Sequence, residues 1–230
     1  MTGIRKPFFI VNPKSYLYGD DVVKLAKIAD KVASQNQLDC LFTGQLIDLP
    51  RIKAATSHLI IAAQHMDPLR PGRGMGHVLP EALKAAGVEA VVLNHAEKPL
   101  GIGVLDQTIT RAKEVGLMTI VCSDTPSESR AIATLHPTMM ICEPTSLIGT
   151  GSISNEDYIK ATNEAVRDVD ANILIMQAAG VSTGVDVKKV LQLGADGTGG
   201  TSGIIKAPDW QAKLEEMMGA MAAYKEAQLA

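Results

Sequence analysis

The chain has 230 residues, of which 46% are hydrophobic and only 3% are aromatic. This length is usual for one α/β barrel, and a core of aliphatic side chains favours an α/β protein over an aromatic-rich β-sandwich. The net charge of −3, without any basic block, argues against nucleic acid and against anionic membrane surfaces as partners, but leaves room for a local phosphate site.

Eight short apolar runs recur along the chain and predict β-strands. They lack the strict apolar–polar alternation of a sheet with one wet face, and are typical of parallel strands that are buried on both faces. In chain order the runs span residues 7–12, 38–42, 58–64, 90–95, 117–122, 138–142, 172–176 and 196–202. The last is the weakest prediction, because its DGTGGTSG stretch is rich in glycine.

Segments with helical periodicity lie between these runs. Asn155 followed by two acidic residues is a typical helix start, and Gly116 and Gly194 stand where helices should end. Alternation of strands and helices implies parallel βαβ units, and eight strands are the number that closes a barrel. The sequence therefore predicts an α/β fold, a single (β/α)8 barrel over residues 1–230. The clearest helical segments are residues 20–35, 105–116, 155–169 and 183–194.

The longest irregular stretch spans residues 65–79 and includes MDPLRPGRGMGHV, with two prolines and three glycines. A loop of this length in a compact barrel usually has a function. Because an exposed loop of this kind is a liability on a monomer, we expect a homodimer or homotetramer that associates through it, with Met66 and Met75 facing a partner subunit.

The cysteines and the apolar runs bear on the compartment. Cys40, Cys122 and Cys142 are odd in number, lack C-x-x-C spacing and lie in or beside apolar runs, which predicts buried thiols in a reducing compartment. The first residues lack the apolar stretch of a signal peptide, and no run approaches 18 apolar residues. We therefore expect a cytoplasmic protein.

Polar side chains follow several of the predicted strands, at the barrel end where chemistry takes place. Lys14, His95 and Glu143 follow the first, fourth and sixth strands. A base, a neutral polariser and a fixed cation are what removal of a proton next to a carbonyl needs. Each residue alone also has a simpler interpretation: a surface lysine, a core or rim histidine, and a solvated loop carboxylate.

Three further segments predict a lid and a phosphate site. In EPTSLIGTGSIS, residues 143–154, Pro144 stiffens the start and the Gly149-Thr150-Gly151 stretch is flexible, as expected of a loop that closes over a ligand. The glycine-rich residues 178–184 and 197–203 follow the last two strands, where barrels often hold phosphate beside a short helix, here predicted to begin at 204–206. No G-x-G-x-x-G follows the first strand, which disfavours a dinucleotide fold.

Six segments, in order and at the expected strands, carry a family resemblance. They are NPK at residues 12–14, AQHMDPLRPGRGMGHVLPEALKAAG, LNHAEKP, CEPTSLIGTG, AAGVSTGVDVKK and TSGIIKA. Together they span nearly the whole chain and resemble the triosephosphate isomerase family, in particular its shorter archaeal-type branch. Several motifs in this order are far more specific than any one of them.

The resemblance implies a TIM barrel that interconverts glyceraldehyde 3-phosphate and dihydroxyacetone phosphate through an enediolate, without a metal or an organic cofactor. It implies that Glu143 is the base, that neutral His95 polarises the carbonyl and that Lys14 stabilises the enediolate charge. Asn12 would orient the substrate, and Glu97 would order Lys14 or the subunit interface. Backbone N–H groups would hold the phosphate near Ile148, Gly149, Gly180, Ser182, Thr201 and Ser202.

Several residues depart from the family pattern. Pro13 replaces an aromatic residue, Met75 replaces a threonine, Ala96 replaces a serine, and the GTGG of residues 197–200 replaces bulky aliphatics. These changes leave open an isomerase of the same chemistry that acts on a four- or five-carbon sugar phosphate. A catalytically silent phosphate-binding paralogue is a further alternative, against which the retained base argues.

Overall fold

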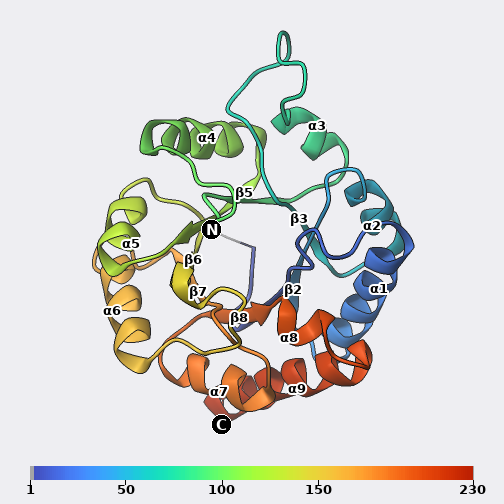
Figure 1. The fold of residues 1–230 in the computed structure, drawn as a ribbon, viewed down its shortest axis with the longest axis vertical. Helices are drawn as coiled ribbons and strands as arrows, with labels where there is room; N and C mark the ends of the chain where they lie inside the picture. Colours follow the sequence, from blue (N-terminus) through green and yellow to red (C-terminus); the bar gives the residue numbers. More distant parts are fainter. Residues whose placement is uncertain (1–2, 230) are drawn as a thin grey trace.

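A computed structural model describes residues 3–229, which form a closed barrel of eight parallel strands (Figure 1). Each strand pairs with the next in chain order, and the last pairs with the first. The predicted (β/α)8 barrel is thus confirmed, its eighth strand included. The strands are β1 Phe8–Val11, β2 Asp39–Gly44, β3 Ile60–Ala63, β4 Ala90–Leu93, β5 Met118–Ser123, β6 Met139–Cys142, β7 Leu174–Gln177 and β8 Gly197–Gly200.

Helices form a ring around the strands (Figure 1). The four helical segments predicted from the sequence correspond to α1, α4, α6 and α7. The side chain of Asn155 caps α6 by accepting the Tyr158 N–H at 2.8 Å, and Gly116 ends α4 in the left-handed region with φ 72°. The helices are α1 Gly19–Gln35, α2 Leu49–Ala55, α3 Pro80–Ala85, α4 Ile102–Val115, α5 Pro126–Ala133, α6 Glu156–Arg167, α7 Gly184–Gln192, α8 Ser202–Ile205 and α9 Trp210–Leu229, with a 3₁₀ turn, η1, at Thr145–Leu147.

Each strand buries both of its faces. Along β1, Phe8 and Ile10 belong to the apolar cluster inside the barrel, whereas Phe9 and Val11 belong to the cluster between strands and helices. Successive side chains of a strand point to opposite faces, so two cores require apolar residues at every position. This explains why the strands appear in the sequence as continuous apolar runs.

The glycines of β8 make room for β1. A side chain at Gly197 would overlap the ring of Phe8, which is fully buried, and one at Gly199 would overlap the backbone of Ile10. Glycine, which is rare in strands, is therefore required in β8 because Phe8 and the backbone of Ile10 occupy the space that side chains would need. The GTGG sequence accommodates Phe8 inside the barrel instead of simply widening it.

The short helix after β8 begins earlier than predicted. It starts at Ser202 and not at residues 204–206, because the Ile205 N–H already donates to the Thr201 carbonyl at 2.9 Å. Gly203 lies within this helix and is required by packing, since a Cβ there would lie 2.7 Å from the Cβ of Ser182.

The segment between β3 and α3 projects well beyond the ring of helices (Figure 1). Its base is closed by Asp67, whose N–H donates to the Val78 carbonyl and whose carboxylate accepts the Val78 N–H at 2.7 Å. Met75 at the tip is fully exposed, whereas Met66 is fully buried. The expectation that Met66 faces a partner is therefore wrong, because that side chain belongs to the core.

The three cysteines are unpaired and buried, as predicted, and burial raises the pKa of each thiol. Within residues 3–229, no helix combines the length and apolar character needed to cross a membrane.

Candidate active site

A cavity of about 420 Å³ opens at the carboxyl ends of the strands. Its floor is apolar and consists of residues that the sequence did not single out: Ile10, Val92, Ile141 and Met176 from the strands, and Ala178, which follows β7. Their signal was present in the alternation of each strand, but it was masked because both faces are apolar. The walls contain all ten residues that the sequence nominated: Asn12, Lys14, His95, Glu143, Ile148, Gly149, Gly180, Ser182, Thr201 and Ser202.

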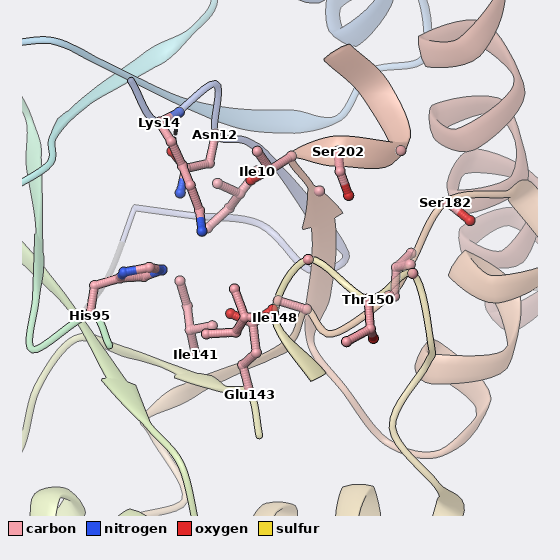
Figure 2. Close-up of a pocket in the computed structure, with 18 of the residues that line it drawn as sticks. Ile10, Asn12, Lys14, His95, Ile141, Glu143, Ile148, Thr150, Ser182 and Ser202 are labelled. Atoms are coloured by element: carbon pink, nitrogen blue, oxygen red, sulfur yellow. Dashed lines mark hydrogen bonds between the residues drawn. The ribbon is translucent and has the colours of Figure 1, made fainter. Parts of the chain in front are cut away.

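The three candidate catalytic side chains point into one space (Figure 2). Lys14 and His95 enter from one side and Glu143 enters from the opposite side, while Ser182 and Ser202 lie at the far end of the cavity. Among residues 3–229, no group of three or more His, Cys, Asp and Glu side chains is arranged to hold a metal ion.

Lys14 lies on a tight turn after β1. Its backbone has φ 48°, in the left-handed region, and its N–H donates to the Asn12 side chain at 3.0 Å. The ammonium donates to a carboxylate oxygen of Glu97 at 2.7 Å, and this hydrogen bond lowers the pKa of Glu97. The side chain of Lys14 is only 15% exposed, so its charge is held at the cavity wall and not dispersed in solvent.

His95 is presented as a hydrogen-bond donor. Its Nδ1 accepts the Glu97 N–H at 3.1 Å, so a neutral ring carries its proton on Nε2. Burial lowers the pKa of the imidazole, and the charge of Lys14 lowers it further. A neutral imidazole whose Nε2–H points into the cavity is able to polarise a carbonyl oxygen through a hydrogen bond, without carrying a positive charge itself.

The position of His95 depends on the residue before it. Asn94 has φ 57°, and its side chain donates to the Cys122 carbonyl at 3.0 Å and accepts the Leu100 N–H at 2.9 Å. Asparagine tolerates the left-handed conformation better than most residues. This side chain thus ties the loop after β4 to the end of β5.

Glu143 follows β6 directly, and its N–H donates to the Ser123 carbonyl at 3.0 Å. Its carboxylate makes no hydrogen bond with the rest of residues 3–229. Burial raises the pKa of Glu143, and the positive charge of Lys14 acts in the opposite direction. A poorly solvated carboxylate without donors is a stronger base than a solvated one.

The segment after Glu143 is tethered at its start and open at its centre. The Thr145 N–H donates to the Asp124 carboxylate at 2.9 Å, and the Tyr158 hydroxyl donates to the Asp124 carbonyl at 2.6 Å. Gly149 and Gly151 both have φ 79°, and an added Cβ at either would meet no atom within 4 Å. This geometry suits a lid with a fixed hinge and an adaptable tip.

The two glycine-rich loops pack tightly against their neighbours. Gly180 has φ 69°, and a side chain there would overlap the backbone of Ser152 at the end of the lid segment. The Ser182 N–H donates at 3.1 Å to the Asp186 carboxylate, which also forms a capping box with Thr183 at the start of α7. This backbone donor, which the sequence nominated for phosphate, is therefore already engaged.

Three other backbone donors that line the cavity lack acceptors within residues 3–229. The Ile148 N–H donates to the Thr145 carbonyl at 3.3 Å, but those of Gly149, Gly180 and Ser202 donate to no acceptor within residues 3–229. N–H groups that converge on a concave surface are suited to an anion.

Comparison with known proteins decides the family. Residues 7–217 match the family model described as triosephosphate isomerase. The chain belongs to the triosephosphate isomerase family. The resemblance of the sequence motifs is thereby confirmed.

Archaeal relatives align along nearly their full length, and each is named triosephosphate isomerase. That of Methanocaldococcus jannaschii is 34% identical over 214 residues, which cover 91% of this chain and 97% of the relative. That of Caldivirga maquilingensis is 36% identical over 219 residues, covering 93% and 97%. That of Methanobacterium bryantii is 34% identical over 217 residues, covering 92% and 96%.

Proposed function

We propose that this chain interconverts dihydroxyacetone phosphate and glyceraldehyde 3-phosphate, with Glu143 as the base, His95 as the electrophile and Lys14 as the charge stabiliser. The observation that carries the proposal is the convergence of these three side chains on one cavity whose far end consists of glycine-rich loops. The name shared by the relatives supports the choice of substrate.

The chemistry follows from the protonation states of the three groups. The Glu143 carboxylate removes a proton from C1 of dihydroxyacetone phosphate, while Nε2–H of His95 donates a hydrogen bond to the C2 carbonyl oxygen. The electron pair of the broken C–H bond forms the enediolate, whose negative charge faces the Lys14 ammonium. The proton held by Glu143 then returns to C2. Nε2 of His95 gives its proton to O2 and takes the proton of O1–H, so that C1 becomes the aldehyde and C2 carries a hydroxyl.

Phosphate binding uses mainly the backbone. The N–H groups of Gly149, Gly180 and Ser202 are available to the phosphate oxygens, together with the backbone at Thr201. The Ser182 N–H and hydroxyl both donate to the Asp186 carboxylate, at 3.1 and 3.4 Å, and the longer bond of the hydroxyl is the one that gives way to the phosphate. Closure of the lid, residues 144–154, places Ile148 and Gly149 over the substrate and keeps water away from the enediolate.

A panel of triose, tetrose and pentose phosphates tests the choice of substrate. We expect a kcat/KM for glyceraldehyde 3-phosphate within the usual enzyme range of roughly 10⁴–10⁸ M⁻¹s⁻¹. A value several orders of magnitude lower, with faster turnover of a longer sugar phosphate, would refute the proposal in favour of the four- or five-carbon alternative.

Assembly through the projecting loop, residues 65–79, is proposed on the basis of exposure. Met75 at its tip is fully exposed, and further large apolar side chains are exposed on the loops after β1 and β2, namely Tyr16, Tyr18, Leu46 and Ile47. Exposed apolar side chains on these loops favour a protein partner. We propose that the partner is a second copy of this chain, in a homodimer or homotetramer of the cytoplasm. Sedimentation that gives a stable monomer at micromolar concentration would contradict this assembly.

A further inference from the structure

The turn that carries Lys14 is held by side chains from the next two strands. Gln64, which follows β3, donates its Nε2–H to the Lys14 carbonyl at 3.0 Å. Thr43, near the end of β2, donates its hydroxyl proton to Oδ1 of Asn12 at 2.6 Å. Nε2 of Gln64 also lies 3.4 Å from the Thr43 hydroxyl oxygen, so the three side chains form a continuous hydrogen-bonded relay.

The relay forms the top layer of the barrel interior. Leu41 and Ala62 belong to the interior cluster, and alternate residues along a strand point to the same face. Thr43 and Gln64, each two positions further on, therefore point inward above that apolar layer. Three neighbouring strands thus present polar side chains at the level where substrate enters.

Two backbone groups fix the direction of every hydrogen bond in the relay. The Lys14 N–H is only a donor, so the atom of Asn12 that faces it must be Oδ1. The Lys14 carbonyl is only an acceptor, so Gln64 must present Nε2. Since Oδ1 of Asn12 can only accept, the single hydroxyl proton of Thr43 is directed to it.

This arrangement leaves one group of Asn12 available. Its Oδ1 accepts two hydrogen bonds, whereas its Nδ2 donates to no acceptor within residues 3–229. Asn12 lines the active-site cavity, and in Figure 2 it lies beside Lys14 at the cavity wall. The relay therefore turns an amide donor towards the space that the substrate oxygens occupy.

The hydroxyl of Thr43 is not needed to fill the barrel interior. The side chain is fully buried, where valine would fill the same volume without the cost of desolvating a hydroxyl. The hydroxyl faces Asn12, which belongs to the turn where Lys14 adopts φ 48°. A left-handed conformation of a non-glycine residue persists where surrounding contacts hold it.

We propose that Thr43 is a positioning residue for the isomerisation, acting through Asn12 on the turn that delivers Lys14 to the substrate. The inference rests on the proposed function for the identity of the substrate, but not for the existence of the relay. Thr43 itself does not touch the reacting atoms.

Thr43→Val tests this directly, because it keeps the shape and removes the proton. We expect kcat/KM for glyceraldehyde 3-phosphate to fall by about tenfold, the order expected for one lost hydrogen bond to an oriented group. Thr43→Ser should restore the value to within about threefold of the wild type. Thr108→Val is the matched control, since Thr108 is equally buried on α4 and donates at 2.7 Å to the Val104 carbonyl.

A double-mutant cycle separates positioning from a structural role. In an Asn12→Ala background, Thr43→Val should cost nothing further, because its acceptor is gone. A tenfold loss that persists in that background, or a Thr43→Val enzyme equal to the wild type, would overturn the proposal. A drop in Tm shared by Thr43→Val and the Thr108→Val control, with kcat/KM unchanged, would assign the hydroxyl to stability alone and would also overturn it.

Binding measurements keep this test independent of turnover. Phosphoglycolate carries a carboxylate where the enediolate carries its charge, and calorimetry gives its Kd for each variant. Thr43→Val should raise the Kd of phosphoglycolate by about tenfold and leave the Kd of inorganic phosphate unchanged. A wild-type protein that is inactive on triose phosphates would refute the proposed function. Equal Kd values of phosphoglycolate for the wild type and for Thr43→Val would refute the role of Thr43.

Discussion

On the β1–β4 side of the active-site mouth, polar side chains hold one another, whereas on the β6–β8 side the surface is largely glycine backbone. Lys14 is bonded to Glu97, and His95 accepts a backbone N–H from the same residue. Opposite them, Gly180 packs against the lid segment, and its N–H has no acceptor within residues 3–229. Glu143 lies between the two regions, and its carboxylate accepts no hydrogen bond from residues 3–229.

The difference separates two tasks. In the proposed function, side chains of the first region perform the chemistry, because proton transfer and charge stabilisation need particular functional groups. In the same proposal, backbone groups of the second region bind the phosphate, because a dianion needs many convergent donors more than it needs any one side chain. Substitutions on the first side should therefore reduce kcat, and substitutions on the second side should act on substrate binding and lid closure.

The largest effect is expected at the border, for Glu143→Gln. We expect kcat to fall by at least about 10²-fold with KM nearly unchanged, because an amide cannot accept the substrate proton. Steady-state kinetics in both directions measures the loss. Glu164→Gln, at an exposed position of α6, is the matched control and should retain full activity. Full activity of Glu143→Gln would show that another group is the base.

Lys14→Met probes the side-chain region. Loss of the fixed cation should lower kcat/KM by about 10²-fold, the order found when one stabilising group is removed from a developing negative charge. Single-turnover and steady-state rates with glyceraldehyde 3-phosphate give the value. Lys31→Met, on the exposed face of α1, provides a control for the loss of one positive charge. A decrease no greater than that of Lys31→Met would contradict the assignment of Lys14.

Gly180→Ala probes the backbone region. Its φ of 69° and the close backbone of Ser152 leave no space for a methyl group, so the end of the lid must move. We expect about a tenfold loss in kcat/KM, mainly in KM. Gly219→Ala is the control: it lies in α9, a Cβ there meets nothing within 4 Å, and the helix should gain about 0.5–1 kcal/mol of stability. Unchanged KM for Gly180→Ala would remove this loop from the phosphate site.

The smallest expected effect is a shift in the pH profile. Because burial raises the pKa of Glu143, kcat/KM should begin to fall, as pH is lowered, above the ordinary range of a glutamate. Lys14 lowers the pKa of Glu143, so in Lys14→Met that pKa rises and the acid limb should move to higher pH. The pH dependence of kcat/KM, measured for the wild type and for Lys14→Met, gives the position of the acid limb in each enzyme. A shift of the acid limb to lower pH in Lys14→Met would contradict the electrostatic coupling.

Much of the fold was predictable because its signals are local. Eight apolar runs, the cap at Asn155 and the stop at Gly116 each occupy a few neighbouring residues, and all were found where predicted. The start of α8 lies at Ser202 and not at residues 204–206. Met66 lies in the core and not at an interface, because burial of a side chain depends on tertiary contacts that the sequence does not display. Likewise, the need for glycine at 203 follows only from the closeness of Ser182.

The candidate site was predictable in its residue types but not in its connections. The sequence nominated Lys14, His95 and Glu143 from their places after strands. It gave no sign that the N–H of Ser182 is bonded to Asp186, nor that Thr43 orients Asn12, because these partners come together only when the barrel closes. Hydrogen-bond direction depends on geometry that composition and spacing do not encode.

Conversion of dihydroxyacetone phosphate in D₂O, followed by NMR of the product, tests the central claim most directly. If the Glu143 carboxylate carries the proton between the two carbons and exchanges it with solvent, deuterium should appear at C2 of glyceraldehyde 3-phosphate. Glu143→Gln should then show neither turnover nor incorporation at a comparable rate. Incorporation of deuterium by Glu143→Gln at the wild-type rate would contradict the assignment of Glu143 as the base.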